Sequence, residues 1–243
     1  MPILETKNLT KRFDGVRAVD DLSIAIEKGI VSGIIGPNGS GKTTLINVLT
    51  GMMPLNSGVV IVDGVSLRKV IPYQIPLYGI TRTFQDVRLF NQMTVLDNIL
   101  VVLTERNVFS ALREKHSEYH LEKAKEILEK VGLWGKCDEL AVNLSYGQRK
   151  LLEIARAISM NPEIFLLDEP FAGLFPKMVE IVSGVIKELK NYGKTIILIE
   201  HNMNLIRELC DYIFVMDNGK LLAQGKPAEV LNKREVIEAY LGE

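Results

Sequence analysis

Short apolar runs dominate both ends of this 243-residue chain, whereas helical spacing dominates its middle. The runs ILETKNLTKRF, AVDDLSIAIEKG and GVVIVDG mix alternating apolar and polar positions with turn residues such as Asp63-Gly64, as half-buried strands do. IVSGIIG is continuously apolar, which is typical of a parallel strand buried on both faces. It runs directly into GPNGSGKTTLINVLTG, which reads as a glycine-rich turn followed by a helix.

After one more short strand, ITRTFQ, the period of the apolar positions changes. VLDNILVVL and GQRKLLEIARAI read as helices, and a third helix is indicated by the spacing of Leu121, Ala124, Ile127, Leu128 and Val131. We therefore expect a helical subdomain from about residue 86 to residue 160.

The strand pattern returns after Pro162. IFLLDE and TIILIEH are apolar runs that end in acidic or polar residues, and PKMVEIVSGVIKELKNYG is a helix between them. DYIFVMDNGKLLAQG predicts a hairpin with Asn218-Gly219 at its turn. Strands that alternate with helices predict a largely parallel α/β sheet, with the helical block inserted between its two halves.

Composition narrows the class of protein. The chain is 47% hydrophobic, enough for a sizeable core, and its net charge of −1 lacks the basic excess of a nucleic-acid binder. No apolar run is long enough to span a bilayer, and the first residues lack the apolar core of a signal peptide. Cys137 and Cys210 make no disulfide framework, so we expect a cytoplasmic protein.

The segment GPNGSGKT, residues 36–43, fits the phosphate-binding pattern G-x-x-x-x-G-K-[ST]. Glycines let backbone N–H groups turn toward phosphate oxygens, and the N-terminus of the following helix adds partial positive charge. We expect Lys42 to bind the β- and γ-phosphates and the Thr43 hydroxyl to bind Mg²⁺. A plain glycine turn that caps a helix is the weaker interpretation.

Asp168 and Glu169 end the apolar strand FLLDE. Ligands of open α/β sheets bind at the carboxyl ends of strands, so both carboxylates are expected beside the phosphate loop. Neighbouring strand residues point to opposite sides, which favours different roles. We assign Asp168 to the Mg²⁺ shell and Glu169 to polarising the attacking water. The competing interpretation is a solvated acidic turn before Pro170.

His201 ends the next strand at the same edge of the sheet, where it could hold the γ-phosphate and the attacking water. A satisfied structural histidine is the usual alternative, but the strand-end position favours function. Lys42, Glu169 and His201 are therefore the predicted catalytic residues.

The stretch LSYGQ, comprising Leu144, Ser145, Tyr146, Gly147 and Gln148, stands at the head of a predicted helix. Ser145 and Gln148 have the spacing of a capping box. Tyr146 and Gly147 are poorer helix formers than Ala or Leu, so a plain helix start does not explain them.

GPNGSGKT, LSYGQ, LLDEP at 166–170 and EH at 200–201 resemble, in order and spacing, the ATP-binding subunit of ABC transporters. The resemblance implies an α/β fold: a P-loop NTPase (RecA-like) core with an N-terminal antiparallel β subdomain and an inserted α-helical subdomain. It implies one domain over residues 1–243, with 1–85 and 162–243 as the nucleotide-binding core and 86–161 as the helical subdomain.

In that family two subunits meet head to tail, so the resemblance implies that LSYGQ of one subunit faces the nucleotide of the other. Gly147 would then let the backbone approach a γ-phosphate closely. The same resemblance makes Gln85 a ligand of Mg²⁺, together with Thr43 and Asp168. It also implies that Phe13 stacks on adenine and that Val19 touches the base. The alternative for Phe13 is a packing role in the hydrophobic core. The implied ATP contacts are Phe13, Val19, Gly36, Pro37, Asn38, Gly39, Ser40, Gly41, Lys42, Thr43, Thr44 and Gln85.

ITRTFQDVRLFNQMTVLDNI, LSYGQRKLLEIARAI, DEPFAGL, IEHNMNLI and VIEAYLGE are similar to segments of branched-chain amino-acid importer ATPases. This implies an ATPase that uses ATP and Mg²⁺ and lies peripherally on the inner face of the cell membrane. The implied partners are a second ABC ATPase subunit, identical or not, transmembrane permease subunits that dock on residues 86–100, and indirectly a substrate-binding protein. No nucleic-acid partner is expected.

Two other functions stay open from the sequence. Lipopolysaccharide-export ATPases share DEPFAGL but tend to carry LSGGE in place of LSYGQ, and a P-loop switch protein would not transport at all. One departure from the family pattern bears on the second alternative. In AGLFP, Phe175 stands where the family usually has an acidic or amide residue, which puts communication between two subunits in doubt.

Overall fold

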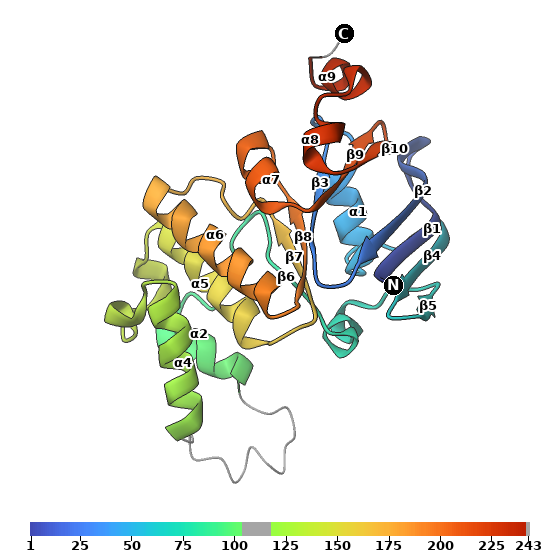
Figure 1. Cartoon of the computed structure of the whole chain (residues 1–243). Helices are drawn as coiled ribbons and strands as arrows, with labels where there is room; N and C mark the ends of the chain where they lie inside the picture. The colour runs from blue at the N-terminus through green and yellow to red at the C-terminus, as the bar shows by residue number, and fades with distance from the viewer. Residues whose placement is uncertain (104–117, 242–243) are drawn as a thin grey trace. The chain divides into compact units, whose positions relative to one another are not determined.

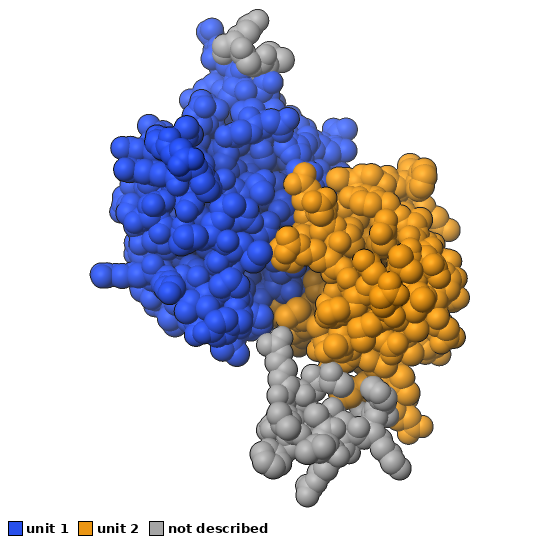
Figure 2. Space-filling model, turned by 180° about the vertical axis from the view of Figure 1, so that it is seen from behind, with its two compact units in different colours: residues 1–82, 163–169, 186–243 blue, residues 83–162, 170–185 orange. Residues whose placement is uncertain are grey.

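The computed structural model describes residues 1–103 and 118–241 of the chain, which form two compact units (Figure 2). Unit 1 consists of Met1–Arg82, Glu163–Glu169 and Ile186–Glu243. Unit 2 consists of Thr83–Pro162 and Pro170–Val185. Residues 170–185, which the sequence assigns to the core, thus group with the helical part.

Unit 1 contains two β-sheets (Figure 1). The antiparallel sheet has the order β2-β1-β4-β5, with β1 Pro2–Phe13, β2 Val16–Glu27, β4 Ser57–Val62 and β5 Val65–Leu67. The second sheet has the order β10-β9-β3-β8-β7-β6, with β3 Val31–Ile35, β6 Ile80–Arg82, β7 Ile164–Asp168, β8 Thr195–Ile199, β9 Tyr212–Asp217 and β10 Lys220–Gly225. All its neighbours are parallel except β9 and β10. The predicted fold class is confirmed.

The helices predicted after the phosphate loop, in the middle of the chain and between the strands FLLDE and TIILIE are present as α1, α2, α4, α5 and α6. Unit 1 holds α1 Lys42–Leu49, η1 Pro72–Tyr78, α7 Met203–Leu209, α8 Pro227–Val230 and α9 Arg234–Leu241. Unit 2 holds α2 Val95–Leu103, α4 Glu118–Lys130, η2 Trp134–Lys136, η3 Ala141–Asn143 and α5 Tyr146–Ser159. The remaining helix, α6 Pro176–Asn191, begins in unit 2 and ends in the residues counted with unit 1.

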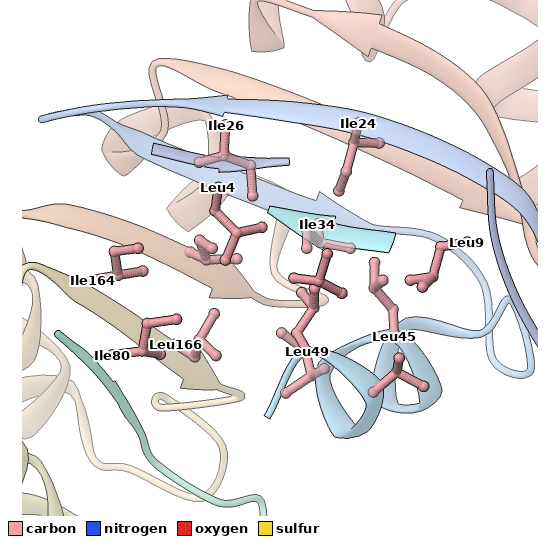
Figure 3. Packing of buried hydrophobic residues seen from close by; sticks show 14 of the residues in the cluster. Leu4, Leu9, Ile24, Ile26, Ile34, Leu45, Leu49, Ile80, Ile164 and Leu166 are labelled. Carbon is pink, nitrogen blue, oxygen red and sulfur yellow. The ribbon is translucent and has the colours of Figure 1, made fainter. Parts of the chain in front are cut away.

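The hydrophobic core of unit 1 fixes the helix that follows the phosphate loop. Figure 3 shows Leu45 and Leu49 of α1 in one hydrophobic cluster with Ile34 of β3 and with leucines and isoleucines of β1 and β2. Leu45, Leu49 and Ile34 are at most 1% exposed. Burying one such side chain stabilises the fold by roughly 1.5–3 kcal/mol. The start of α1 is therefore anchored at the carboxyl edge of the parallel sheet.

Two local predictions have different outcomes. The hairpin turn at Asn218-Gly219 is confirmed, and both residues have the positive φ angles, 44° and 78°, that a two-residue hairpin turn requires. The strand predicted from ITRTFQ is too long: β6 ends at Arg82, where its pairing with β7 stops. Gln85 therefore does not close a strand.

Candidate functional site

The phosphate loop is held so close to neighbouring backbone that only glycine fits at its two ends. A Cβ at Gly36 would lie 2.1 Å from the carbonyl oxygen of Met216, and one at Gly41 would lie 2.2 Å from that of Ala18. Gly41 has φ 100° and stands directly before α1. Within the described chain no side chain caps the N-terminus of this helix, so its first N–H groups suit an anion.

Lys42 folds back over the loop that precedes it. Its ammonium group donates to the carbonyl oxygens of Gly36 at 2.8 Å and Pro37 at 2.9 Å. Burial lowers the pKa of Lys42, while the carboxylates of Glu169 and Asp168 act in the opposite direction. The amine therefore stands in the field of both strand-end carboxylates, inside the loop that the sequence predicts to bind phosphate.

Asp168 and Glu169 have different environments, although they are neighbours in the chain. Asp168 is only 2% exposed, and its Oδ2 accepts a 2.8 Å bond from a guanidinium N–H of Arg82. Glu169 is half-buried, and its backbone N–H donates to the carbonyl of Ile199 on β8 at 3.0 Å. One carboxylate is thus buried in an ion pair, and the other reaches the surface of unit 1.

Glu169 also has an unusual backbone. Its φ is 48°, in the left-handed region that disfavours residues with a Cβ. Among the described residues, the other non-glycine positions with positive φ are all Asn or Asp, which tolerate this conformation: Asn8, Asp14, Asp21, Asp63, Asn161 and Asn218. Strain of this kind tends to occur at functional sites, and here it coincides with the predicted base.

His201 meets Glu169 across the neighbouring strand ends. The His201 Nε2 lies 3.0 Å from the Glu169 Oε1, and the imidazole is 42% exposed. The residues on each side hold it in place: the Glu200 carboxylate accepts the backbone N–H groups of His201 and Asn202. Asn202 in turn caps α7 by accepting the N–H groups of residues 204 and 205. A carboxylate and an imidazole in contact can bind and orient one water.

The donors available for a metal are hard oxygen atoms. Among the described residues, no group of three or more His, Cys, Asp or Glu side chains lies close enough to hold a metal by itself. The hydroxyl of exposed Thr43 and the carboxylate of Asp168 instead match Mg²⁺, which commonly takes one or two carboxylates together with substrate phosphates. The residues therefore fit the predicted ion.

In unit 2, the predicted capping box at LSYGQ is confirmed. The Gln148 N–H donates to the Ser145 hydroxyl at 3.3 Å, and the Ser145 N–H donates to the Gln148 side chain at 3.0 Å. Tyr146 is 44% exposed. A Cβ at Gly147 would lie 2.6 Å from the sulfur of Met178 on α6, a flexible side chain that can move aside. The phosphate role of Gly147 stays a prediction.

Gln85 is exposed in unit 2. Side chains of α5 bond to the backbone of the segment that contains it. The buried carboxylate of Glu153 accepts the N–H groups of Phe84 at 3.3 Å and Arg88 at 3.2 Å. Arg156 donates to the Arg88 carbonyl at 2.8 Å. The role of Gln85 toward Mg²⁺ stays a prediction, but its chain segment is fixed on both sides.

The remaining predicted positions differ in exposure. Phe13 is 41% exposed at the end of β1, and the Lys11 ammonium lies over one face of its ring, 4.9 Å from the ring centre; its contact with adenine stays a prediction. Val19 is fully buried in the core of unit 1, which favours a packing role over contact with a base. Phe175 is 75% exposed.

Arg82 and Glu153 were not predicted from the sequence. Glu153 stands in the largely apolar helix LLEIARAI, and a charge there generally has a buried partner, which was the available signal. Arg82 stands between two threonines in the predicted strand ITRTFQ, where the pattern gives no such signal. Neither partner is close in sequence.

Comparison with known proteins places the chain among transport ATPases. Residues 19–172 match the family model described as ABC transporter, and residues 220–243 match that of the branched-chain amino acid ATP-binding cassette transporter. The chain is 41% identical over 252 residues to the high-affinity branched-chain amino acid transport ATP-binding protein LivG of Salmonella typhimurium, covering 100% of this chain and 98% of the relative.

Two solved structures extend the similarity. The ADP conformation of MJ1267, an ATP-binding cassette of an ABC transporter, is 39% identical with a TM-score of 0.85 and full coverage of both chains. A dimeric post-hydrolysis state of the ATP-binding cassette MJ0796, bound to ADP and Pi, is 26% identical with a TM-score of 0.81, covering 92% of this chain and 98% of that one. No helix within residues 1–103 and 118–241 is long and apolar enough to cross a membrane.

Proposed function

The chain belongs to the ABC transporter family, and from this membership we propose that it is the ATP-binding and ATP-hydrolysing subunit of an importer for branched-chain or other hydrophobic amino acids. Partner membrane subunits would carry the substrate, and ATP hydrolysis would drive their cycle. The amino-acid assignment is supported by the relatives' names and by the match at residues 220–243. Neither lipopolysaccharide export nor a switch without transport has comparable support.

The contact between Glu169 and His201 carries this proposal. Both side chains lie at the ends of neighbouring parallel strands, in the same unit as the phosphate loop. In the proposed reaction Glu169 polarises the attacking water, and His201 orients this water and the γ-phosphate. Lys42, which bonds to the loop carbonyls, exchanges these for β- and γ-phosphate oxygens.

Thr43 and Asp168 would hold Mg²⁺, with Gln85 as the further ligand predicted from the sequence. When bound, the ion would supply positive charge against the negative charge that develops on the phosphate oxygens in the transition state. The protein's own contribution is the position of its oxygen donors, which are held by α1 and β7.

We propose a second ABC ATPase subunit as the direct partner, with LSYGQ of each subunit facing the nucleotide of the other. The preformed capping box and the exposed side chains of Ser145 and Tyr146 support this arrangement, because they present the start of α5 at the surface of unit 2. Transmembrane permease subunits would dock on residues 86–100 and connect the chain to a substrate-binding protein. These partners would keep the ATPase peripheral on the cytoplasmic face of the membrane.

Substitution of Glu169 by Gln tests the catalytic assignment. Hydrolysis of Mg·ATP should slow by roughly 10²–10⁴-fold, since the water loses its base, whereas nucleotide affinity should stay unchanged. Glu180→Gln, an exposed position on α6, is the matched control and should hydrolyse ATP at the parent rate. Parent-like turnover in Glu169→Gln would contradict the assignment.

The same variant tests the proposed pairing. Its solution mass should double on addition of Mg·ATP, because nucleotide is retained at the shared interface. A monomeric mass with nucleotide bound would exclude a homodimer of this chain alone.

A further inference from the structure

We propose that Arg82 is a positioning residue for ATP hydrolysis. It holds the Oδ2 atom of Asp168, which directs the Oδ1 atom toward the Mg²⁺ of the nucleotide. The inference rests on the proposed function, because it concerns how the same site prepares its metal ligand. Arg82 itself touches neither nucleotide nor metal in this proposal.

The guanidinium of Arg82 joins two parts of the site. One terminal nitrogen, Nη2, donates to Asp168 Oδ2 at 2.8 Å. The other, Nη1, donates to the Asn47 side chain at 2.6 Å and the Thr50 hydroxyl at 3.2 Å. Asn47 and Thr50 belong to the last turn and the C-cap of α1, the helix that begins at the phosphate loop. Arg82 therefore connects the carboxylate of β7 to the phosphate-loop helix.

The connection reaches α1 about one turn from Thr43, whose hydroxyl is a predicted Mg²⁺ ligand. Thr43 and Asn47 are four residues apart, so they lie on one face of the helix, one turn from each other. Arg82 bonds both to Asn47 and to Oδ2 of Asp168, the second predicted Mg²⁺ ligand. The same guanidinium is therefore connected to the helix of one predicted ligand and to the carboxylate of the other.

Burial explains why the position requires arginine. The side chains of Arg82 and Asp168 are 7% and 2% exposed, and a buried carboxylate is strongly disfavoured without a partner. A guanidinium stays charged and forms several bonds in fixed directions, whereas a lysine ammonium supplies a point charge without that geometry. The C-terminal end of α1 also favours a cation there. Arg82→Lys therefore retains the charge and removes the fixed orientation.

Equilibrium binding of a fluorescent ATP analogue, measured with Mg²⁺ and with EDTA, tests the proposal. We would compare the parent chain with Arg82→Lys, and use Arg68→Lys, an exposed arginine of the same unit, as the matched control. Affinity in EDTA should stay within about twofold of the parent, because the phosphate loop is intact. The gain in affinity on adding Mg²⁺ should fall about tenfold, the loss expected for one charge-assisted contact. Half-saturation by Mg²⁺ should shift upward by the same factor.

Several results would overturn the inference. An unchanged gain from Mg²⁺ in Arg82→Lys would mean that Arg82 does not position Asp168. A larger gain would mean that the arginine competes with the ion, and an equal loss in EDTA and in Mg²⁺ would reduce its role to general stability. A parent chain that gains no affinity from Mg²⁺ would instead contradict the proposed function.

A second pair of variants keeps the test valid if single changes impair folding. Arg82→Met leaves the Asp168 carboxylate buried without its counterion and should lower the thermal midpoint. Arg82→Met combined with Asp168→Asn removes both charges and should restore part of that loss. Equal midpoints of the single and double variants would show that the Asp168 charge costs no stability when Arg82 is absent, which would also overturn the inference.

Discussion

Glu153 should make the stability of this protein fall as the pH rises from acid to slightly alkaline values. Burial raises the pKa of this carboxyl from 4.5 to about 7, against the opposing effect of the Arg88 and Phe84 N–H groups. The charges of Lys150 and Arg156 also oppose the rise. Because the folded chain binds this proton more tightly than the unfolded chain, the stability that Glu153 contributes is fully present below pH 4.5 and is lost as the pH rises to about 7.

The size of the effect follows from the shift in pKa. A rise from 4.5 to about 7 corresponds to a total of about 3 kcal/mol, since each pKa unit is worth about 1.4 kcal/mol. Part of this is already lost at about pH 5.5, so titration of Glu153 should remove about 2 kcal/mol between about pH 5.5 and about pH 8.

The variant Glu153→Gln isolates this contribution. Its side-chain oxygen can still accept the Phe84 and Arg88 N–H groups, but it no longer ionises. Urea unfolding at a series of pH values should show that the variant gains about 2 kcal/mol relative to the parent between these two pH values. Glu126→Gln, an exposed glutamate of α4 in the same unit, is the matched control and should follow the parent curve.

A difference between Glu153→Gln and the parent that stays constant with pH would refute this reasoning. It would mean that Glu153 remains ionised throughout, with Lys150 and Arg156 offsetting its burial. A difference that changed in the opposite direction would mean that the ionised form is the one the fold stabilises.

Three further predictions concern unit 1. Gly39→Ala should lower the free energy of unfolding by about 1–2 kcal/mol, because the backbone there is left-handed. Gly41→Ala should lower it by about 2 kcal/mol more, because its Cβ would also meet the Ala18 carbonyl, and equal urea midpoints of the two variants would contradict this. His201→Ala should lower kcat for Mg·ATP by about 10²-fold with little change in KM, because orientation of the water is lost while the phosphate loop is kept; an unchanged kcat in a steady-state assay would exclude the role. Asn202→Ala should lower the free energy of unfolding by about 1 kcal/mol through loss of the α7 cap, and an unaltered denaturation curve would show that the cap is not needed.

Local patterns predicted the elements that depend on neighbouring residues. The run VLDNILVVL coincides with α2, and the hairpin at Asn218-Gly219 has the expected turn because two adjacent residues determine it. The capping box at Ser145 and Gln148 was predictable for the same reason, since its partners are three residues apart. Motif spacing then placed the candidate carboxylates at strand ends without any knowledge of the sheet order.

Contacts between distant residues could not be predicted in this way. Arg82 meets Asp168 across 86 positions of sequence, and Glu153 holds the Phe84 N–H across 69. The end of β6 depends on its pairing with β7, and the separation into two sheets depends on β1 pairing with both β2 and β4. The period of the apolar positions predicts that a strand exists, but which strand pairs with it depends on the packing of the whole unit.

The left-handed backbone at Glu169 has a consequence for directed evolution. Glycine adopts this conformation at no steric cost, so Glu169→Gly should relieve part of the local strain and resist heat better than a chain with any other uncharged residue there. A library selected for thermostability alone would enrich for this change and lose the carboxylate at the same time. A screen that demands turnover in every round should therefore be needed to retain Glu169 among the stabilised variants of this ATPase.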